Sequence, residues 1–250
     1  MSHYQQLKFV EISARYLEKA GNLKSNGFKK VLEVGSWDMN GSVKGLFPAT
    51  EYIGIDVASG PGVDHVILGQ EADFKSNYFD IVISCECFEH NKYWVETFSN
   101  MIRMLRPGGV LLITCASVVR GEHGTPRCAN NYSLTSLKLS DSYYQNLDKY
   151  DFMRTGLLKN FSIYKFMNNL YTRDIYFIGI KQGGVASIDF DLISAEVSSM
   201  IKESELSLGQ DIVAKTSYYF RYIIAKILGE KRYHNLVFSL KNMNNGKSKL

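Results

Sequence analysis

Four short apolar segments, each followed by a turn, constrain the fold of this 250-residue chain more than any other feature. They are VLEV (31–34), YIGID (52–56), FDIVIS (79–84) and GVLLITC (109–115). Short apolar runs bounded by turn residues are typical of strands that are buried on both faces. A further strand is expected at 64–68, and a helix at 92–105 separates the last two segments. This alternation predicts a doubly wound, mostly parallel α/β sheet with right-handed crossovers.

The remaining segments complete the expected architecture. Residues 4–20 carry apolar side chains at helical spacing, which predicts an amphipathic helix that caps the sheet edge or a ligand cleft. Segments 161–167 and 173–182 look like a closing pair of strands. From about residue 186 the pattern becomes helical. We therefore expect one α/β domain over residues 1–185 and a C-terminal helical extension over 186–250.

The charge is distributed unevenly along the chain. The net charge is +4, but residues 212–250 alone carry about +7, so the remainder is slightly acidic. This asymmetry argues against a nucleic-acid binder and favours a local contact between the tail and an anionic partner, such as lipid head groups or a glycan. A solvated helical face would show the same pattern. The mixed apolar and basic residues at 211–229 fit a peripheral membrane helix, a helix packed on the domain, or a homodimer contact.

No segment of the sequence resembles an export signal or a membrane span. Charged residues interrupt the first 20 positions, where a secretory signal needs an apolar core. No apolar run reaches the ~18 residues of a spanning helix. We expect a cytoplasmic protein, peripheral at the inner membrane face if its tail binds lipid, with reduced thiols at Cys85, Cys87, Cys115 and Cys128. Their spacing lacks the two-residue gap of zinc ligands, so we expect no metal site.

Signals for ligand binding follow the strands, where open α/β sheets bind their ligands. The segments VLEVGSWDMNGS, YIGID, FDIVISCECFEH and LRPGGVLLITC resemble, in this order over residues 30–115, the motifs of class I S-adenosylmethionine (SAM)-dependent methyltransferases. The resemblance extends to small type-11-like bacterial and phage enzymes of sugar and surface-glycan pathways. It implies a Rossmann-like sheet of seven strands and SAM as the cofactor. The cofactor contacts that it implies are Glu33, Gly35, Ser36, Trp37, Asn40, Gly41, Ser42, Asp56, Val57, Leu68, Gly69, Gln70, Cys85 and Phe88.

Three of these positions have a clear chemical reason. In the family, an acidic residue at the position of Glu33 faces the methionine amino group, whose positive charge needs a partner in a water-poor cleft. Gly35 lets the backbone pass close to a ligand without a Cβ clash. Asp56, at the end of the second strand, can accept hydrogen bonds from both ribose hydroxyls.

Two positions depart from the family pattern. Trp37 stands where the second glycine of the loop normally lies. Leu68 and Gly69 follow the third strand, where relatives place an acidic residue against the adenine, and Gln70 or Glu71 can substitute for it. Leu68 can still pack on the adenine ring, and the Gly69 amide can donate a hydrogen bond.

Two histidines are candidates for a general base. Methyl transfer is an in-line displacement on an activated sulfonium, so an enzyme aligns the acceptor and, for a hydroxyl, removes a proton. His90 follows the fourth strand and His123 lies in the loop after the fifth, both at the expected mouth of the cleft. Neighbouring Glu122, Arg120 and Arg127 can bind a polar or anionic acceptor, which makes His123 the first choice. Either histidine can instead be a polar loop residue.

These observations predict an O-methyltransferase that acts on a small polar acceptor, such as a sugar or surface-glycan precursor. N-methylation of a small molecule or protein is an alternative, although the Asn/Asp-Pro-Pro-aromatic motif of many amino-group methyltransferases is absent. That absence also argues against methylation of flipped nucleic-acid bases. A nicotinamide oxidoreductase shares the carboxylate after the second strand but needs a complete glycine fingerprint. A non-catalytic scaffold that no longer binds cofactor is the third alternative.

Overall fold

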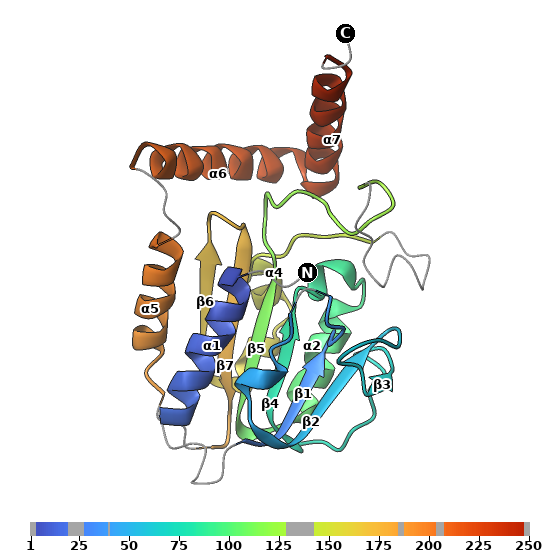
Figure 1. The fold of residues 1–250 in the computed structure, drawn as a ribbon, viewed down its shortest axis with the longest axis vertical. Helices are drawn as coiled ribbons and strands as arrows, with labels where there is room; N and C mark the ends of the chain where they lie inside the picture. The colour runs from blue at the N-terminus through green and yellow to red at the C-terminus, as the bar shows by residue number, and fades with distance from the viewer. Residues whose placement is uncertain are drawn as a thin grey trace.

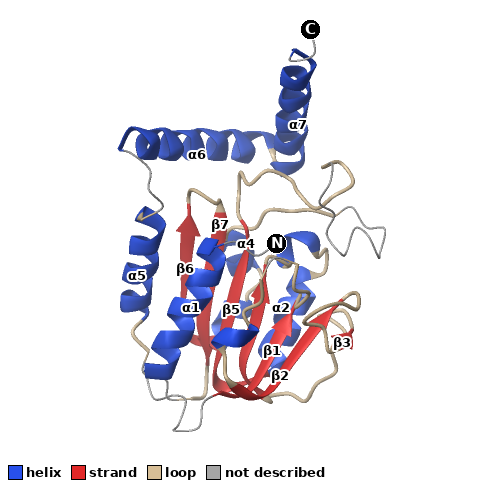
Figure 2. Ribbon diagram, in the orientation of Figure 1, coloured by secondary structure: helices blue, strands red, loops and turns tan. Residues whose placement is uncertain are grey.

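One sheet organises the protein in the computed structural model, which describes residues 4–19, 28–39, 41–128, 143–184, 188–203 and 208–247. In these residues the sheet has seven strands in the spatial order β3-β2-β1-β4-β5-β7-β6. Their bounds are β1 Phe28–Val34, β2 Ala49–Asp56, β3 His65–Val66, β4 Phe79–Cys85, β5 Leu105–Ala116, β6 Phe161–Asn169 and β7 Asp174–Lys181. Figures 1 and 2 show the sheet with helices on both faces.

The strand directions define the fold class. β2 pairs in parallel with β3 and β1, β4 pairs in parallel with β1 and β5, and β7 runs antiparallel to both of its neighbours, β5 and β6. The strand order reverses between β1 and β4, which makes the carboxyl ends of these strands the expected ligand site. The predicted Rossmann-like sheet of seven strands, mostly parallel, is confirmed.

Two apolar layers cover the sheet. On one face, α2 (Trp94–Met104) and α4 (Lys149–Arg154) pack with the short 3-10 turn η3 (Leu157–Asn160). On the other face, α1 (Tyr4–Lys19) and α5 (Phe190–Lys202) pack together, and Phe9 stacks on Tyr176 of β7 at 4.7 Å between ring centroids. Burial of these apolar residues is the main stabilising contribution to the fold.

The C-terminal helices lie across the carboxyl edge of the sheet. Figure 1 shows α6 (Leu208–Leu228) above the ends of β5, β6 and β7, with α7 (Glu230–Lys247) turning away from it. Gly229, at a φ of +77°, supplies the left-handed turn between the two helices. A small apolar cluster joins them to the segment after β5 and consists of Val118, Val119, Tyr218, Ala225 and Tyr233.

The expected elements agree with the structure except in extent. The helix expected at 4–20 is α1, and the closing strands are β6 and β7. β3 has two residues where five were expected, because it is the edge strand and its described pairing is with β2 alone. The division after residue 185 stays a prediction, and α5 beyond it packs into the same core as α1. No described helix is long and apolar enough to cross a membrane.

Candidate active site

A cleft opens at the carboxyl ends of β1 and β2, where the strand order reverses. Its cavity volume is about 250 Å³. Six of the predicted cofactor residues line it, together with seven residues that sequence reasoning did not select. The six predicted ones are Gly35, Asp56, Val57, Leu68, Gly69 and Gln70. The others are Val34, Ile55, Ile67, Cys87, Asn91, Lys92 and Tyr93.

The turn after β1 depends on Gly35. Its φ of +82° is a conformation that favours glycine, and a Cβ built there would lie 2.7 Å from Cβ of Cys87. The amides of Gly35 and Ser36 both donate hydrogen bonds to the Ile55 carbonyl, at 2.9 and 3.1 Å. The backbone therefore turns tightly beside the cleft, and the absence of a side chain at Gly35 makes room for Cys87.

Asp56 is the carboxylate at the end of β2. Oδ2 accepts a hydrogen bond from the Trp37 amide at 3.0 Å, and Oδ1 accepts one from the Val57 amide at 2.6 Å. Burial raises the pKa of Asp56, and these two amide hydrogen bonds oppose that rise. Each carboxylate oxygen has a further lone pair, so Asp56 can also accept hydrogen bonds from a ligand diol.

Trp37 replaces the usual glycine by turning its side chain away from the cleft. A Cβ on Gly60 would lie 2.2 Å from Nε1 of Trp37, so the indole packs directly on the Gly60 backbone. Ser36 is buried against Gly54 and Gly62 in the same way. Thus the loop keeps its backbone path at Trp37 because glycines elsewhere make room for the side chain.

The other predicted residues of this loop lie near its surface. The Gly41 amide donates to Oδ1 of Asp38 at 2.8 Å, and the Ser42 hydroxyl accepts from the Lys44 amide at 3.0 Å. Neither residue lines the cleft. Asn40 lies outside the described residues.

Three predicted cofactor residues stand apart from the cleft lining. Glu33 is 6% exposed, and its Oε2 accepts a hydrogen bond from the Tyr52 hydroxyl at 2.7 Å. Burial raises the pKa of Glu33 to about 7. Cys85 ends β4, where burial raises the pKa of its thiol, and Phe88 is fully buried among the aromatic rings of the α2 face. Their cofactor roles stay predictions.

A second polar cluster lies beside the cleft, in the segments that follow β4 and β5. The 3-10 turn η2 (Phe88–His90) carries His90, whose ring is 5.2 Å from that of His123 between centroids, at 90°. The Tyr144 hydroxyl lies 3.1 Å from Nδ1 of His123. The two histidines that the sequence placed at the mouth of the cleft are therefore neighbours.

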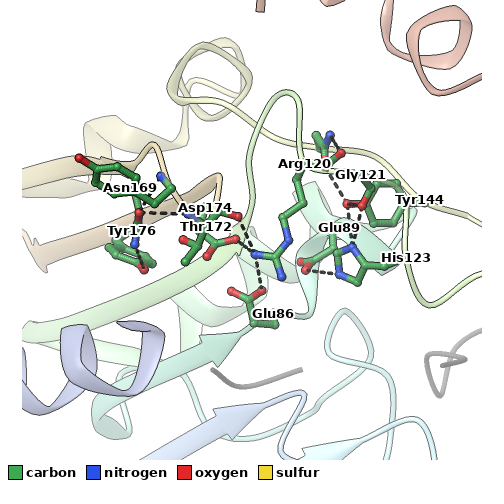
Figure 3. Close-up of polar contacts among 12 residues, drawn as sticks. Glu86, Glu89, Arg120, Gly121, His123, Tyr144, Asn169, Thr172, Asp174 and Tyr176 are labelled. Atoms are coloured by element: carbon green, nitrogen blue, oxygen red, sulfur yellow. Dashed lines mark hydrogen bonds and ion pairs between the residues drawn. The ribbon is translucent and has the colours of Figure 1, made fainter. Parts of the chain in front are cut away.

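Buried acidic side chains surround these histidines. Glu89 is fully buried, and its Oε1 lies 3.8 Å from Nε2 of His123. Figure 3 shows Arg120 between Glu86 and Asp174, with its guanidinium 3.7 Å from Glu86 Oε2 and in an ion pair with Asp174. Charged groups this deeply buried require a functional or structural reason, because desolvation is costly.

Burial also controls the protonation of both histidines. It lowers the pKa of His123 to about 4, with the charge of Arg120 as the second cause. It lowers the pKa of His90 far below its usual value, and the neighbouring His123 adds to the effect. Both rings are therefore neutral at neutral pH, and each has one unprotonated nitrogen that can accept a proton or bind a cation.

The C-terminal helix α7 covers this polar cluster. His234 packs on Tyr144 at 5.6 Å between ring centroids, and its Nε2 lies 3.4 Å from the side-chain amide of Asn146. Arg127, in the loop that follows His123, donates a hydrogen bond to Asn235 Oδ1 at 2.8 Å. The tail thus packs against the segments that carry and contact His123, which the sequence alone did not indicate.

Residues 52–113, about a quarter of the chain, match the family described as "Methyltransferase domain". The chain is similar to the CurJ carbon methyltransferase, with a TM-score of 0.50 and 15% identity, over 70% of this chain and 54% of that one. No protein of curated function matches it in sequence.

A second similar structure is phosphoethanolamine N-methyltransferase 2 of Haemonchus contortus in complex with S-adenosyl-L-methionine. The TM-score is 0.43 and the identity 18%, over 84% of this chain and 49% of that one. The chain therefore spans about half the length of these two proteins.

The fold is that of the class I SAM-dependent methyltransferases. Residues 52–113, within this sheet, match a methyltransferase family, and the cofactor of methyltransferases with this fold is SAM. The cleft fits that cofactor, because Asp56 offers acceptors for ribose hydroxyls and Ile67 and Leu68 form an apolar wall suited to adenine.

Proposed function

We propose that the protein transfers the methyl group of SAM to a hydroxyl of a small polar acceptor, such as a sugar or surface-glycan precursor. SAM bound in the cleft supplies an electrophilic methyl group. The observation that supports a hydroxyl acceptor is the pair of neutral histidines, His90 and His123, beside the cofactor cleft. A hydroxyl loses a proton as it is methylated, and a neutral imidazole can accept it.

The polar walls of the acceptor side favour a hydrophilic substrate. Arg120, Glu89, Tyr144 and Asn146 all come from segments that follow β4 and β5. Side chains of this kind can hold a polyhydroxylated molecule by hydrogen bonds. His123 stays our first choice for the base, because its Nδ1 contacts Tyr144 and Gly121 while its Nε2 has no hydrogen-bond partner among the described residues.

The test is transfer of labelled methyl from SAM to an extract separated into small-molecule, lipid-linked glycan, protein and RNA fractions. Label in sugar nucleotides or glycans is the expected outcome. Label in protein or in an amine would replace the proposed acceptor with the N-methyltransferase alternative. No label in any fraction, with no SAM binding detected by calorimetric titration, would leave the non-catalytic scaffold.

We also propose that the protein is cytoplasmic and that α6 rests on the anionic inner face of a membrane. Tyr218, Tyr222 and Ala225 of α6 pack on the domain, whereas its other side exposes apolar residues. The exposed residues are Ile212, Val213, Tyr219, Phe220, Ile223 and Ile227, with Lys215 exposed among them. An apolar helix face next to basic residues is typical of peripheral membrane helices.

Flotation with vesicles tests this contact. The full chain should float with anionic phosphatidylglycerol vesicles and not with neutral phosphatidylcholine vesicles. Ile223→Ser combined with Ile227→Ser should abolish flotation, while Leu236→Ser on α7 serves as a matched control. If the chain instead stays in solution and sediments as a dimer that the double variant dissociates, the apolar face is a dimer interface and the membrane proposal is wrong.

A further inference from the structure

Glu89, His90 and His123 form a cluster whose composition matches a metal site. They offer one carboxylate and two imidazoles, and their ligand atoms all lie within 4.8 Å of one another. Ligands about 2.0–2.2 Å from a common ion would be roughly 3 to 4 Å apart. Small rotations of the side chains would therefore close the cluster around an ion.

Glu89 supplies an independent observation. Its side chain is fully buried, and among the described residues neither of its carboxylate oxygens has a hydrogen-bond partner. Nε2 of the neutral His123 ring lies 3.8 Å from Oε1 of Glu89. Buried carboxylates without partners are rare, because desolvation is uncompensated. A cation between Glu89 and His123 would compensate it.

The surroundings of His123 favour metal binding at Nε2. Nδ1 lies 3.1 Å from the Gly121 carbonyl oxygen, a geometry in which Nδ1 carries the proton and donates it. The unprotonated Nε2 then directs its lone pair toward Glu89, and it has no hydrogen-bond partner among the described residues. Metal-binding histidines are typically oriented by this kind of backbone hydrogen bond.

Buried acids nearby add negative charge to the same region. Glu86 begins the turn that carries Glu89, and Asp174 lies at the start of β7. Arg120 pairs with both of them, rather than with Glu89. Arg120 is therefore engaged by Glu86 and Asp174 and is not the ion-pair partner of Glu89.

We propose that Glu89, His90 and His123 bind one divalent transition-metal ion at the acceptor side of the site. Two imidazoles and one carboxylate favour ions such as Zn²⁺ and Mn²⁺ and leave coordination positions open. An ion held there would lower the pKa of an acceptor hydroxyl and so replace the weakly basic histidine in that task. Only this use of the ion rests on the proposed function; the binding itself does not.

The binding test uses the full chain after treatment with a chelator. Zn²⁺ is titrated by calorimetry, and Mn²⁺ is followed by electron paramagnetic resonance, each as the metal alone. We expect one ion per chain and a rise in unfolding temperature on binding. Glu89→Gln and His123→Gln should each lower the affinity by at least about tenfold, whereas His65→Gln, an exposed histidine on β3, should not.

Circular dichroism confirms that each variant is folded; if Glu89→Gln is not, the less buried His123→Gln carries the comparison. Failure of the folded wild-type chain to bind either ion, or equal affinity in wild type and both variants, would overturn the proposal. Ion binding without methyl transfer to any acceptor would keep the metal site and reject the proposed function. Methyl transfer that is unaffected by the chelator, in a chain that binds no ion, would keep the proposed function and reject the metal site.

Discussion

The backbone amide of Trp37 donates a hydrogen bond to Oδ2 of Asp56 across 3.0 Å, which joins the loop after β1 to the end of β2. The two residues come from separate motifs, 19 positions apart in the chain. Because the Asp56 carboxylate also accepts from the Val57 amide, its orientation is fixed before any ligand arrives. A preorganised acceptor of this kind reduces the entropy lost on binding.

Replacing Asp56 with Ala should weaken SAM binding by about 10- to 100-fold. The change removes the acceptor of the ribose hydroxyls, and hydrogen bonds to a charged group each contribute about 1.5–3 kcal/mol. Calorimetric titration with S-adenosylhomocysteine measures the effect. Asp73 is an exposed carboxylate that does not line the cleft, so the Asp73→Ala variant should bind S-adenosylhomocysteine with wild-type affinity. Equal affinity in the two variants would contradict the assignment of the cofactor cleft.

Gly35→Ala should destabilise the fold more than Gly156→Ala. Both glycines have positive φ, +82° and +69°, so both variants carry backbone strain of about 1 kcal/mol. Only at Gly35 does the new Cβ also meet another side chain, at 2.7 Å from Cβ of Cys87. We expect an additional loss of about 1–3 kcal/mol there. Urea unfolding of both variants measures the difference, and equal losses would mean that Cys87 moves aside.

The stability of the protein should depend on Glu33 between roughly pH 4.5 and 7. Burial raises the pKa of Glu33 from 4.5 to about 7, so the folded state binds this proton more tightly than the unfolded state. The resulting stabilisation is fully present below the unfolded pKa and is lost as the pH rises through about 7. Its upper limit is about 3 kcal/mol.

Glu33→Gln isolates this contribution, because the amide stays neutral and can still accept from Tyr52. The unfolding free energy of the variant, compared with wild type at roughly pH 5 and pH 8, should fall less with rising pH. Glu71→Gln, an exposed residue, should keep the wild-type slope. A slope unchanged by Glu33→Gln would show that Glu33 is already ionised in the folded protein at low pH.

Ala225→Glu should release the C-terminal helices from the domain. Ala225 is 3% exposed in the contact between α6 and the segment after β5, and an unpaired charge there would be costly to bury. Amide hydrogen exchange should accelerate in α6 and α7 while the sheet remains protected. Ile223→Glu, on the exposed side of the same helix, is the matched control. Protection of α6 in both variants would contradict the observed docking.

The strands and the cofactor edge were predictable because they depend on local patterns. Runs such as FDIVIS are apolar on both faces only in a central strand, and the rule that ligands bind at the carboxyl ends placed His90 and His123 together. The turn after the first strand was also expected to need a glycine, and Gly35 has a positive φ there.

The rest of the site depends on long-range packing that no local pattern carries. Tyr144 is brought to His123 from 21 residues away. Asn146 meets His234 across 88 residues of sequence. Cys87 and Tyr93 line the cleft because η2 bends the chain back over it, and a single turn of 3-10 helix has no clear periodicity.

The C-terminal helix α7 and the cofactor cleft are built from different parts of the chain. Residues that line the cofactor cleft come from the first half of the chain, whereas α7 contacts the loop after β5, Tyr144 and Asn146. If the acceptor binds beside the two histidines, as proposed, changes in this helix should alter which acceptor is admitted while the affinity for SAM is preserved. For engineering, the tail is the part to exchange when a different acceptor is wanted, and the sheet is the part to leave intact.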